Sequence, residues 1–118
     1  MRLEGRVEKG WGHEEIFATN DHYCGKFLHF KAGKRFSMHF HKEKHETWYI
    51  LKGRFILEWI NTKNAETVVE ALGEGDVWIN EPLKPHRLTC VEEGTIIEVS
   101  TADSVEDNYR IIPGDSQK

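Results

Sequence analysis

The feature that most constrains the fold of this chain is its regular alternation of short apolar segments and glycine-centred turns. The turn glycines are Gly25, Gly33, Gly53, Gly73, Gly75, Gly94 and Gly114. The segments between them are rich in Val, Ile, Phe, Trp and Tyr, which strands prefer. No stretch sustains a 3.6-residue apolar period, and the best helical candidates are residues 7–15 and 103–109. Many short strands with regular turns predict an all-β sandwich or barrel.

Nine strands are expected, and they cover residues 14–18, 23–30, 35–40, 46–52, 54–61, 67–72, 76–79, 86–90 and 95–100. Gly53 is expected to form a tight hairpin between two of these strands. The expected core consists of Trp48, Ile50, Leu57, Trp59, Val77, Ile79, Leu88 and Ile97. Trp11 and Trp78 could line a cavity, but packing in the barrel wall or at a dimer interface is the expected role.

Length and charge limit the organisation and the partners. The 118 residues fit a single domain, with about 1–12 as an N-terminal arm and about 108–118 as a polar tail. The net charge of −4 at pH 7 does not provide the positive charge that nucleic-acid binding requires, so a nucleic-acid partner is not expected. The sequence shows no apolar signal peptide and no apolar segment long enough to span a membrane. Cys24 and Cys90 are predicted to be free, buried thiols. These features favour the cytoplasm as the expected location, without a membrane partner.

The residues that carry chemistry are concentrated between Gly33 and Gly53. His39 and His41 are separated by one residue, so on a strand both imidazoles point to the same face. Glu46 follows after a short loop, at the start of the next expected strand. His86 opens a distant strand and could complete a set of three histidines and one carboxylate.

This set suits one divalent transition metal ion, such as zinc, manganese, iron, nickel, cobalt or copper. The plainer alternative is that the four residues are ordinary polar side chains in or around a barrel. Arg35 and Ser37 are an even number of residues away from His39, so on one strand their side chains lie on the same face as the two histidines. Arg35 and Ser37 are therefore predicted to face inward. A buried arginine needs an anionic partner, which could be Glu98 or the phosphate or carboxylate of a substrate.

The other basic residues of this region have plainer interpretations. Lys42 and Lys44 are predicted to lie in a solvated loop, and His45 is predicted to lie on the surface. The remaining histidines lack ligand spacing and are predicted to be structural: His13, His22 and His29.

The spacing from Gly33 through His39, His41 and Glu46 to Gly53 resembles the first cupin motif residue for residue. The second motif is matched less completely, since Pro82-Leu83-Lys84 replaces its usual Pro-x-Gly and Cys90 stands where Asn is common. The resemblance implies a double-stranded β-helix, a jelly-roll β-barrel, with a metal ion in its mouth.

A closer resemblance, to the cupin domain of type II mannose-6-phosphate isomerases, covers most of the chain. It is carried by the segments Gly10-Trp11-Gly12, Ser37-Met38-His39-Phe40-His41, Glu46-Thr47-Trp48, Pro85-His86-Arg87-Leu88, Ile97-Glu98-Val99 and Glu106-Asp107. One departure is that His39 replaces the glutamine of that family. The sugar-nucleotide transferase domain often fused to the bacterial versions is absent from this sequence, so nucleotidyl transfer is not expected.

The resemblance implies a metal-dependent isomerase that interconverts aldose and ketose sugar phosphates. Lys26 and Glu46 are then the candidate proton-transfer residues, and Arg35, Ser37 and Arg110 are candidate substrate contacts. Two other functions remain open: a metal-dependent dioxygenase, and a non-catalytic module that binds a sugar or small acid. The expected partners are a small-molecule substrate and a second copy of the chain in a homodimer.

Overall fold

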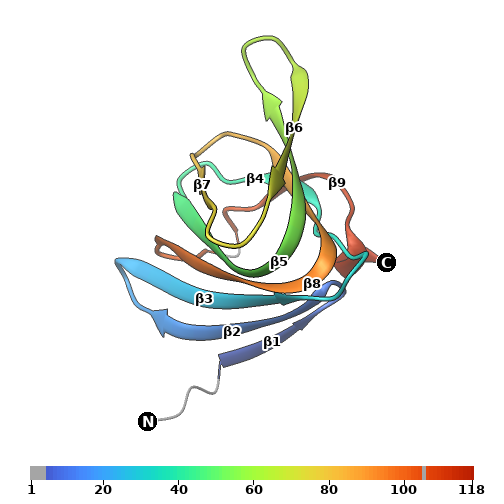
Figure 1. Ribbon diagram of the computed structural model, residues 1–118. Coiled ribbons are helices and arrows are strands. Elements are labelled where there is room, and N and C mark those ends of the chain that lie inside the picture. Colours follow the sequence, from blue (N-terminus) through green and yellow to red (C-terminus); the bar gives the residue numbers. More distant parts are fainter. Residues whose placement is uncertain (1–4, 105) are drawn as a thin grey trace.

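The computed structural model describes residues 5–104 and 106–118, which form a curled, almost purely β molecule (Figure 1). Its strands are β1 (Gly5–Lys9), β2 (Gly12–Thr19), β3 (Tyr23–Phe30), β4 (Met38–Phe40), β5 (Glu46–Asn61), β6 (Glu66–Leu72), β7 (Val77–Asn80), β8 (His86–Thr101) and β9 (Tyr109–Ile112). A 3₁₀ turn, η1 (Asp115–Gln117), follows. One sheet runs in the order β1-β2-β3-β8-β4-β9, and β5 joins it by pairing with β8, β6 and β7. The all-β barrel predicted from the sequence is confirmed.

The two longest strands, β5 and β8, each have 16 residues and pair with each other in antiparallel fashion. The hairpin predicted at Gly53 is therefore wrong, because β5 continues through this glycine. The register of the pair shifts near Gly53, whose φ is 91°, where the backbone lies against Gly94 of β8. A side chain at Gly94 would place its Cβ 2.1 Å from the Lys52 carbonyl oxygen. The two glycines thus allow both strands to bend together at a corner of the barrel.

The two ends of the chain are more regular than the sequence suggested. The helical candidate at 7–15 is not a helix, since β1 and β2 form an antiparallel hairpin there. The N-terminal arm contributes β1 at the sheet edge, while residues 1–4 lie outside the described residues. The expected polar tail contains β9, which pairs with β4, and the described part of 103–109 has a turn but no helix. Open strand edges supply backbone partners that local sequence does not reveal.

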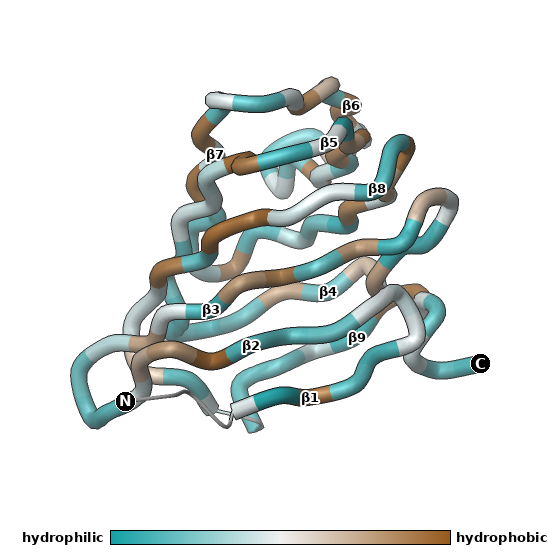
Figure 2. The backbone as a smooth tube through the Cα atoms, turned by 60° about the horizontal axis from the view of Figure 1, so that its bottom comes forward, coloured by the Kyte–Doolittle hydropathy of each residue, from teal (hydrophilic) through white to brown (hydrophobic). Residues whose placement is uncertain are grey.

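The core lies between the facing walls of the barrel. Its buried members are Trp11, Leu28, Phe30, Trp48, Ile50, Phe55, Leu57, Leu72, Leu88, Cys90 and Ile96. Hydropathy changes repeatedly along β3 and β8 (Figure 2), and along most of β8 buried residues alternate with more exposed ones, as expected for a strand with one buried face. Trp48, Ile50, Leu57 and Leu88 are buried as predicted, and Trp59 packs against the core while partly buried.

The prediction for β7 was wrong, because Val77 and Ile79 are 57% and 48% exposed. Trp78 and Asn80 point inward instead. The segment Val-Trp-Ile-Asn has apolar residues on both faces of the strand, so the alternation pattern alone does not show which face is buried. Ile97 of β8 is only partly buried, because its neighbours in sequence are also apolar and the pattern again does not show which face is buried.

The outward face of the sheet carries several exposed apolar side chains, namely Tyr49, Leu51, Val77, Ile79 and Val99. The predicted homodimer stays a prediction. The two cysteines, Cys24 and Cys90, are free and buried, as expected. Among the described residues, no helix has the length and apolar character that crossing a bilayer requires.

Candidate metal centre

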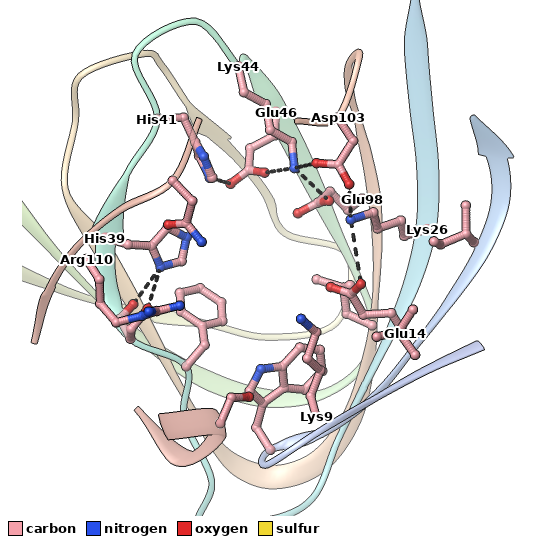
Figure 3. A pocket seen from close by; sticks show the side chains of 18 of the residues that line it. Lys9, Glu14, Lys26, His39, His41, Lys44, Glu46, Glu98, Asp103 and Arg110 are labelled. Carbon is pink, nitrogen blue, oxygen red and sulfur yellow. Dashed lines mark hydrogen bonds and ion pairs between the residues drawn. The ribbon is translucent and has the colours of Figure 1, made fainter. Parts of the chain in front are cut away.

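A cavity of about 390 Å³ opens at one end of the barrel (Figure 3). This volume is within the range of small-molecule sites. One part of its lining is apolar and comes from Trp11, Leu28, Phe36 and Trp48. The polar lining includes Lys9, Glu14, Lys26, Ser37, His39, His41, Lys44, Glu46, Glu98, Asp103 and Arg110. The cavity therefore brings together residues from both ends and the middle of the chain.

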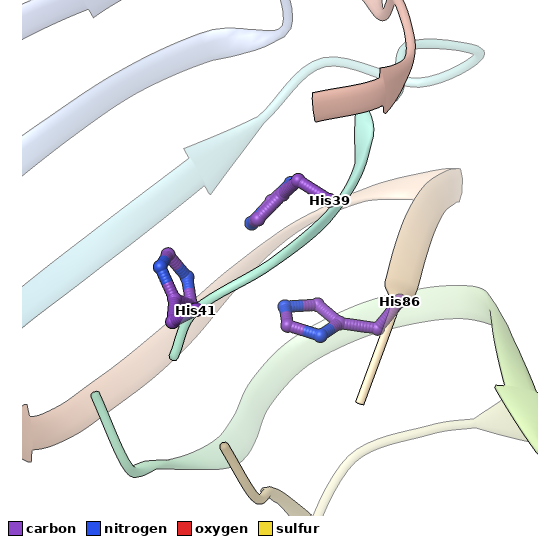
Figure 4. A group of neighbouring side chains, drawn as sticks. All are labelled: His39, His41 and His86. Atoms are coloured by element: carbon purple, nitrogen blue, oxygen red, sulfur yellow. The ribbon is translucent and has the colours of Figure 1, made fainter. Parts of the chain in front are cut away.

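Three histidines converge on one another (Figure 4), and two of them, His39 and His41, line the cavity. His39 of β4 is the cross-strand partner of His86 of β8, and His41 lies just beyond the end of β4. Each histidine offers a ring nitrogen within 4.8 Å of those of the other two. Directly opposed residues on neighbouring strands hold their side chains close, which explains this convergence.

Hydrogen bonds to the backbone fix the orientation of each ring. Nδ1 of His39 lies 2.8 Å from the Ser37 carbonyl oxygen, and Nδ1 of His86 lies 2.9 Å from that of Lys84. Nδ1 of His41 lies 2.5 Å from the Asp107 carbonyl oxygen. A carbonyl only accepts, so each Nδ1 carries a proton, and in a neutral ring the lone pair is then on Nε2. This is the arrangement in which proteins orient metal-binding histidines.

Glu46 at the start of β5 stands beside two of these histidines. Its Oε1 lies 3.3 Å from Nε2 of His86 and 3.9 Å from Nε2 of His41. The Asn80 side chain donates to the same carboxylate oxygen at 3.2 Å. Nε2 of His86 is buried and has no hydrogen-bond partner among the described residues. A buried nitrogen lone pair without a donor is costly unless something else satisfies it.

The protonation states also fit a divalent transition metal ion. Burial, reinforced by the neighbouring rings of His86 and His41, lowers the pKa of His39 to about 3. Burial lowers the pKa of His41 as well. Burial alone would raise the pKa of Glu46, but the charge of Lys44 contributes to holding it well below its usual range. Neutral imidazoles and an ionised carboxylate are the donors that such ions require.

A second group of side chains, which we call the ionic wall, lines the cavity beside the histidines (Figure 3). It consists of Glu14, Lys26, Lys44, Glu98 and Asp103. Nζ of Lys44 lies 3.0 Å from Asp103, 3.4 Å from Glu46 and 3.7 Å from Glu98. Nζ of Lys26 lies 2.9 Å from Asp103 and 3.6 Å from Glu14. Each buried lysine is therefore compensated by carboxylates.

The strand register places the ionic wall. Lys26 of β3 and Trp48 of β5 are the two cross-strand partners of Glu98 on β8. The Trp48 indole donates to Glu98 at 3.0 Å. Burial, together with the charge of Glu46, raises the pKa of Glu98 to about 8. Burial opposes the charge of Lys26 and Lys44, but the surrounding carboxylates raise the pKa of both, so both lysines stay cationic.

The structure places most, but not all, of the predicted site residues in this cavity. Of the predicted ligands, His39, His41 and Glu46 line it, whereas His86 lies outside the lining, next to Glu46. Lys26, Ser37 and Arg110 also line the cavity. The inward orientation predicted for Arg35 is wrong, since Arg35 is exposed and outside the lining. The alternation of strand β4 does not include Arg35, because residues 36 and 37 are not in a strand and both of them line the cavity. Glu98 accordingly pairs with Lys44 rather than Arg35.

Several functional residues escaped the sequence interpretation. Lys44, predicted to be solvated, is 6% exposed and lies at the centre of the ionic wall. Nothing in the local sequence signals its burial. Glu98 carried a usable signal, since it is the single charge in the apolar run Ile96-Ile97-Glu98-Val99. Asp107 was also missed as a support: its carboxylate accepts backbone N–H bonds from 42, 43 and 44 at 2.6, 3.0 and 2.9 Å.

Comparison with known structures identifies the architecture. Oxalate decarboxylase from Bacillus subtilis at pH 4.6 superimposes with a TM-score of 0.76 at 22% identity, over 92% of this chain and 30% of that one. A tryptophan-to-phenylalanine variant of the same enzyme gives 0.76 at 23%, with the same coverage. A third structure, concerned with the Mn(II) centres of that enzyme, gives 0.75 at 21%. This chain thus spans about a third of those chains, and the likeness shows the fold alone.

At the level of sequence, no curated protein matches this chain. The pattern of the cupin domain family, however, matches residues 26–101. This range runs from the middle of β3 to the end of β8 and includes all four predicted ligands. The jelly-roll barrel, the family pattern and the inward-facing histidines agree, and the chain belongs to the cupin family.

Proposed function

We propose that this cupin binds one divalent transition metal ion through His39, His41, Glu46 and His86, and interconverts aldose and ketose sugar phosphates. The supporting observation is that His39, His41 and Glu46 line the same small cavity as the ionic wall, and that the ring nitrogens of His39, His41 and His86 converge beside it. When bound, such an ion polarises a carbonyl or hydroxyl oxygen of the substrate and stabilises developing negative charge. Isomerisation also needs groups that move a proton between adjacent carbons. Zinc, manganese, iron, nickel and cobalt all suit these donors.

The metal part of the proposal has its own support. Three imidazoles with fixed Nδ1 protons offer ring nitrogens within 4.8 Å of one another, and the Glu46 carboxylate lies 3.3 Å from Nε2 of His86. The Mn(II) centres of the structurally similar oxalate decarboxylase are consistent with such a role for this fold. Elemental analysis of the purified protein tests it directly, and a protein that stays metal-free after exposure to all five ions would contradict it.

We assign proton transfer to Glu98. Its carboxylate lies beside Lys44, which also contacts the predicted ligand Glu46, so it is adjacent to the donor set. Glu46 is better suited to holding the ion, because His86 and Asn80 surround it. Lys26 stays cationic between Glu14 and Asp103, which suits the binding of negative charge rather than proton abstraction.

Arg110 supports the phosphate part of the proposal. It lines the cavity and forms no ion pair with any described residue, unlike Lys26 and Lys44. Lys9 lines the same cavity, also without a carboxylate partner in the described part of the chain. A guanidinium group without a partner matches the geometry of a phosphate group.

The test is deuterium exchange and conversion of mannose 6-phosphate and related sugar phosphates, followed by NMR in D₂O with each metal loaded separately. We expect turnover with at least one metal, and a fall of about 10²–10⁴ for Glu98→Gln, typical of a lost acid–base group. Glu93→Gln, an exposed change on the same strand, is the matched control. Absence of exchange with every metal and every sugar phosphate would refute the isomerase.

A metal-dependent dioxygenase is the second candidate, favoured by the apolar side of the cavity. Trp11, Leu28 and Phe36 could cover an organic substrate next to the donor set. Oxygen consumption by the iron- or nickel-loaded protein, with no proton exchange, would favour this activity. A ligand that binds and is released unchanged under both assays would instead indicate a non-catalytic binding module.

A further inference from the structure

A second cluster of donor side chains lies on the outside of the barrel, away from the cavity. It consists of His13 and Glu15 of β2 and His29 of β3, which we call the outer cluster. Each residue offers a ligand atom within 4.8 Å of those of the other two. None of the three lines the cavity, whereas Glu14 of β2 and Leu28 of β3, their neighbours in sequence, do. The outer cluster is therefore on the opposite face of the same strands.

The pairing of β2 with β3 creates this cluster. His13 and His29 are direct cross-strand partners, and their rings stack with centroids 4.5 Å apart. Glu15 follows two residues after His13, so its side chain emerges on the same face. The three residues belong to adjacent paired strands, which hold their backbones in place without any ion.

One carboxylate oxygen faces both imidazoles. Oε1 of Glu15 lies 2.8 Å from Nε2 of His29 and 3.5 Å from Nε2 of His13. Nε2 of His29 is buried, yet it makes no well-aligned hydrogen bond with any described residue. The other ring nitrogen, Nδ1, is engaged by the Thr95 hydroxyl at 3.0 Å. His29 thus has one nitrogen held by the protein and one available to a ligand.

We infer that the outer cluster is a second binding site for a borderline divalent transition metal ion such as zinc. Two imidazoles and a carboxylate are a frequent zinc donor set, with bonds of about 2.0–2.2 Å. The side chains of His13, His29 and Glu15 are 23%, 31% and 46% exposed, so the cluster lies at the surface, and the Glu15 carboxylate lies next to the buried Nε2 of His29. Small side-chain rotations would bring the three donors onto one ion.

The surroundings of the outer cluster contain one further donor and one competitor. Glu8 of β1 is the cross-strand partner of His13 and could provide a fourth ligand. It now pairs with Arg6, which is itself the cross-strand partner of Glu15. Both side chains of that pair are mostly exposed, so water can replace the contact at little cost. An ion in the outer cluster would tie β2 to β3 and so brace the strands that carry Glu14 and Lys26.

The test compares zinc binding by the wild-type protein and by His13→Ala/His29→Ala, using equilibrium dialysis and elemental analysis. We expect the double variant to bind one zinc ion fewer per chain, whether or not the cavity site is occupied. The matched control is His22→Ala/His45→Ala, which removes two exposed histidines elsewhere. Equal zinc content in the wild type and the His13→Ala/His29→Ala variant would overturn the inference.

Imidazole NMR spectra of the wild-type protein provide a readout that needs no variant to fold. On zinc addition, the His13 and His29 ring signals should shift together, while the His22 signals stay in place. Unchanged His13 and His29 signals at zinc saturation would overturn the inference too. Because the readouts are stoichiometry and ring signals, the result does not depend on the proposed isomerase activity.

Discussion

The two sides of the cavity are built in different ways. The donor set of His39, His41, Glu46 and His86 comes from one short segment and one opposing strand, and backbone carbonyls orient its rings. The ionic wall draws its charges from five separate positions between Glu14 and Asp103, and these charges hold one another. Loss of one donor should therefore affect ligand binding, whereas loss of one charge in the ionic wall should affect stability.

The largest effect is expected from His86→Ala, which removes a donor from the centre of the proposed site. We expect stoichiometric metal binding to be lost, while the protein remains folded because its neighbours in β8 are paired along the strand. Elemental analysis and a circular dichroism spectrum would measure the two properties. His45→Ala, an exposed change, should leave metal content untouched. Full metal content in His86→Ala would show that the ion sits elsewhere.

The next effect is expected from Lys44→Met, which keeps the length of the side chain and removes its charge. The carboxylates of Glu46 and Asp103, and the carboxyl group of Glu98, would then lose a buried cationic neighbour. Breaking one member of a buried ion network costs about 3–5 kcal/mol. Urea denaturation of the metal-free protein measures this loss, and Lys42→Met at an exposed position should change stability by less than about 0.5 kcal/mol. Equal stability of both variants would remove the contrast between the two sides.

A smaller effect is expected from Asp107→Ala, which acts on the loop between His41 and Glu46. The Asp107 carboxylate accepts three backbone N–H bonds from that loop. Their loss should cost about 2 kcal/mol and lower metal affinity by roughly 10-fold or more through looser ligands. Denaturation curves and competition with a chelator would measure these changes. Asp115→Ala, which removes a comparable carboxylate–backbone bond to Arg35 away from the ligands, should leave metal affinity unchanged.

The smallest effect concerns pH. Burial alone would raise the pKa of Asp103, but hydrogen bonds and charges from Lys26 and Lys44 lower it to about 2. The unfolded chain then binds more protons than the folded chain between about pH 4 and 2, so stability falls as the pH drops through that window. Asp103→Asn should be less stable than the wild type at pH 7 by about 1 kcal/mol. Denaturation at several pH values should show the free energies of unfolding of the two proteins converging near pH 2. A difference that stays constant with pH would contradict the lowered pKa of Asp103.

Much of the fold and of the site could be predicted because both leave local patterns. Glycine-punctuated apolar segments indicated a barrel, and the spacing of His39, His41 and Glu46 predicted that the three side chains lie near one another, as they do in the cavity lining. The Gly53 hairpin failed for an identifiable reason. A glycine permits a turn and a bend equally well, and only the contact with Gly94 made it a bend.

The sequence by itself determined the strand-forming segments, the backbone geometry that puts His39 and His41 on one face, and the membership in the cupin family. Only the tertiary structure decided which charges are buried. Lys44 and Asp103 are 59 residues apart and meet because the barrel closes between them. His13 and His29 likewise meet only through the register of β2 and β3. Strand alternation is a local property of the chain, whereas ion pairs depend on distances that folding sets.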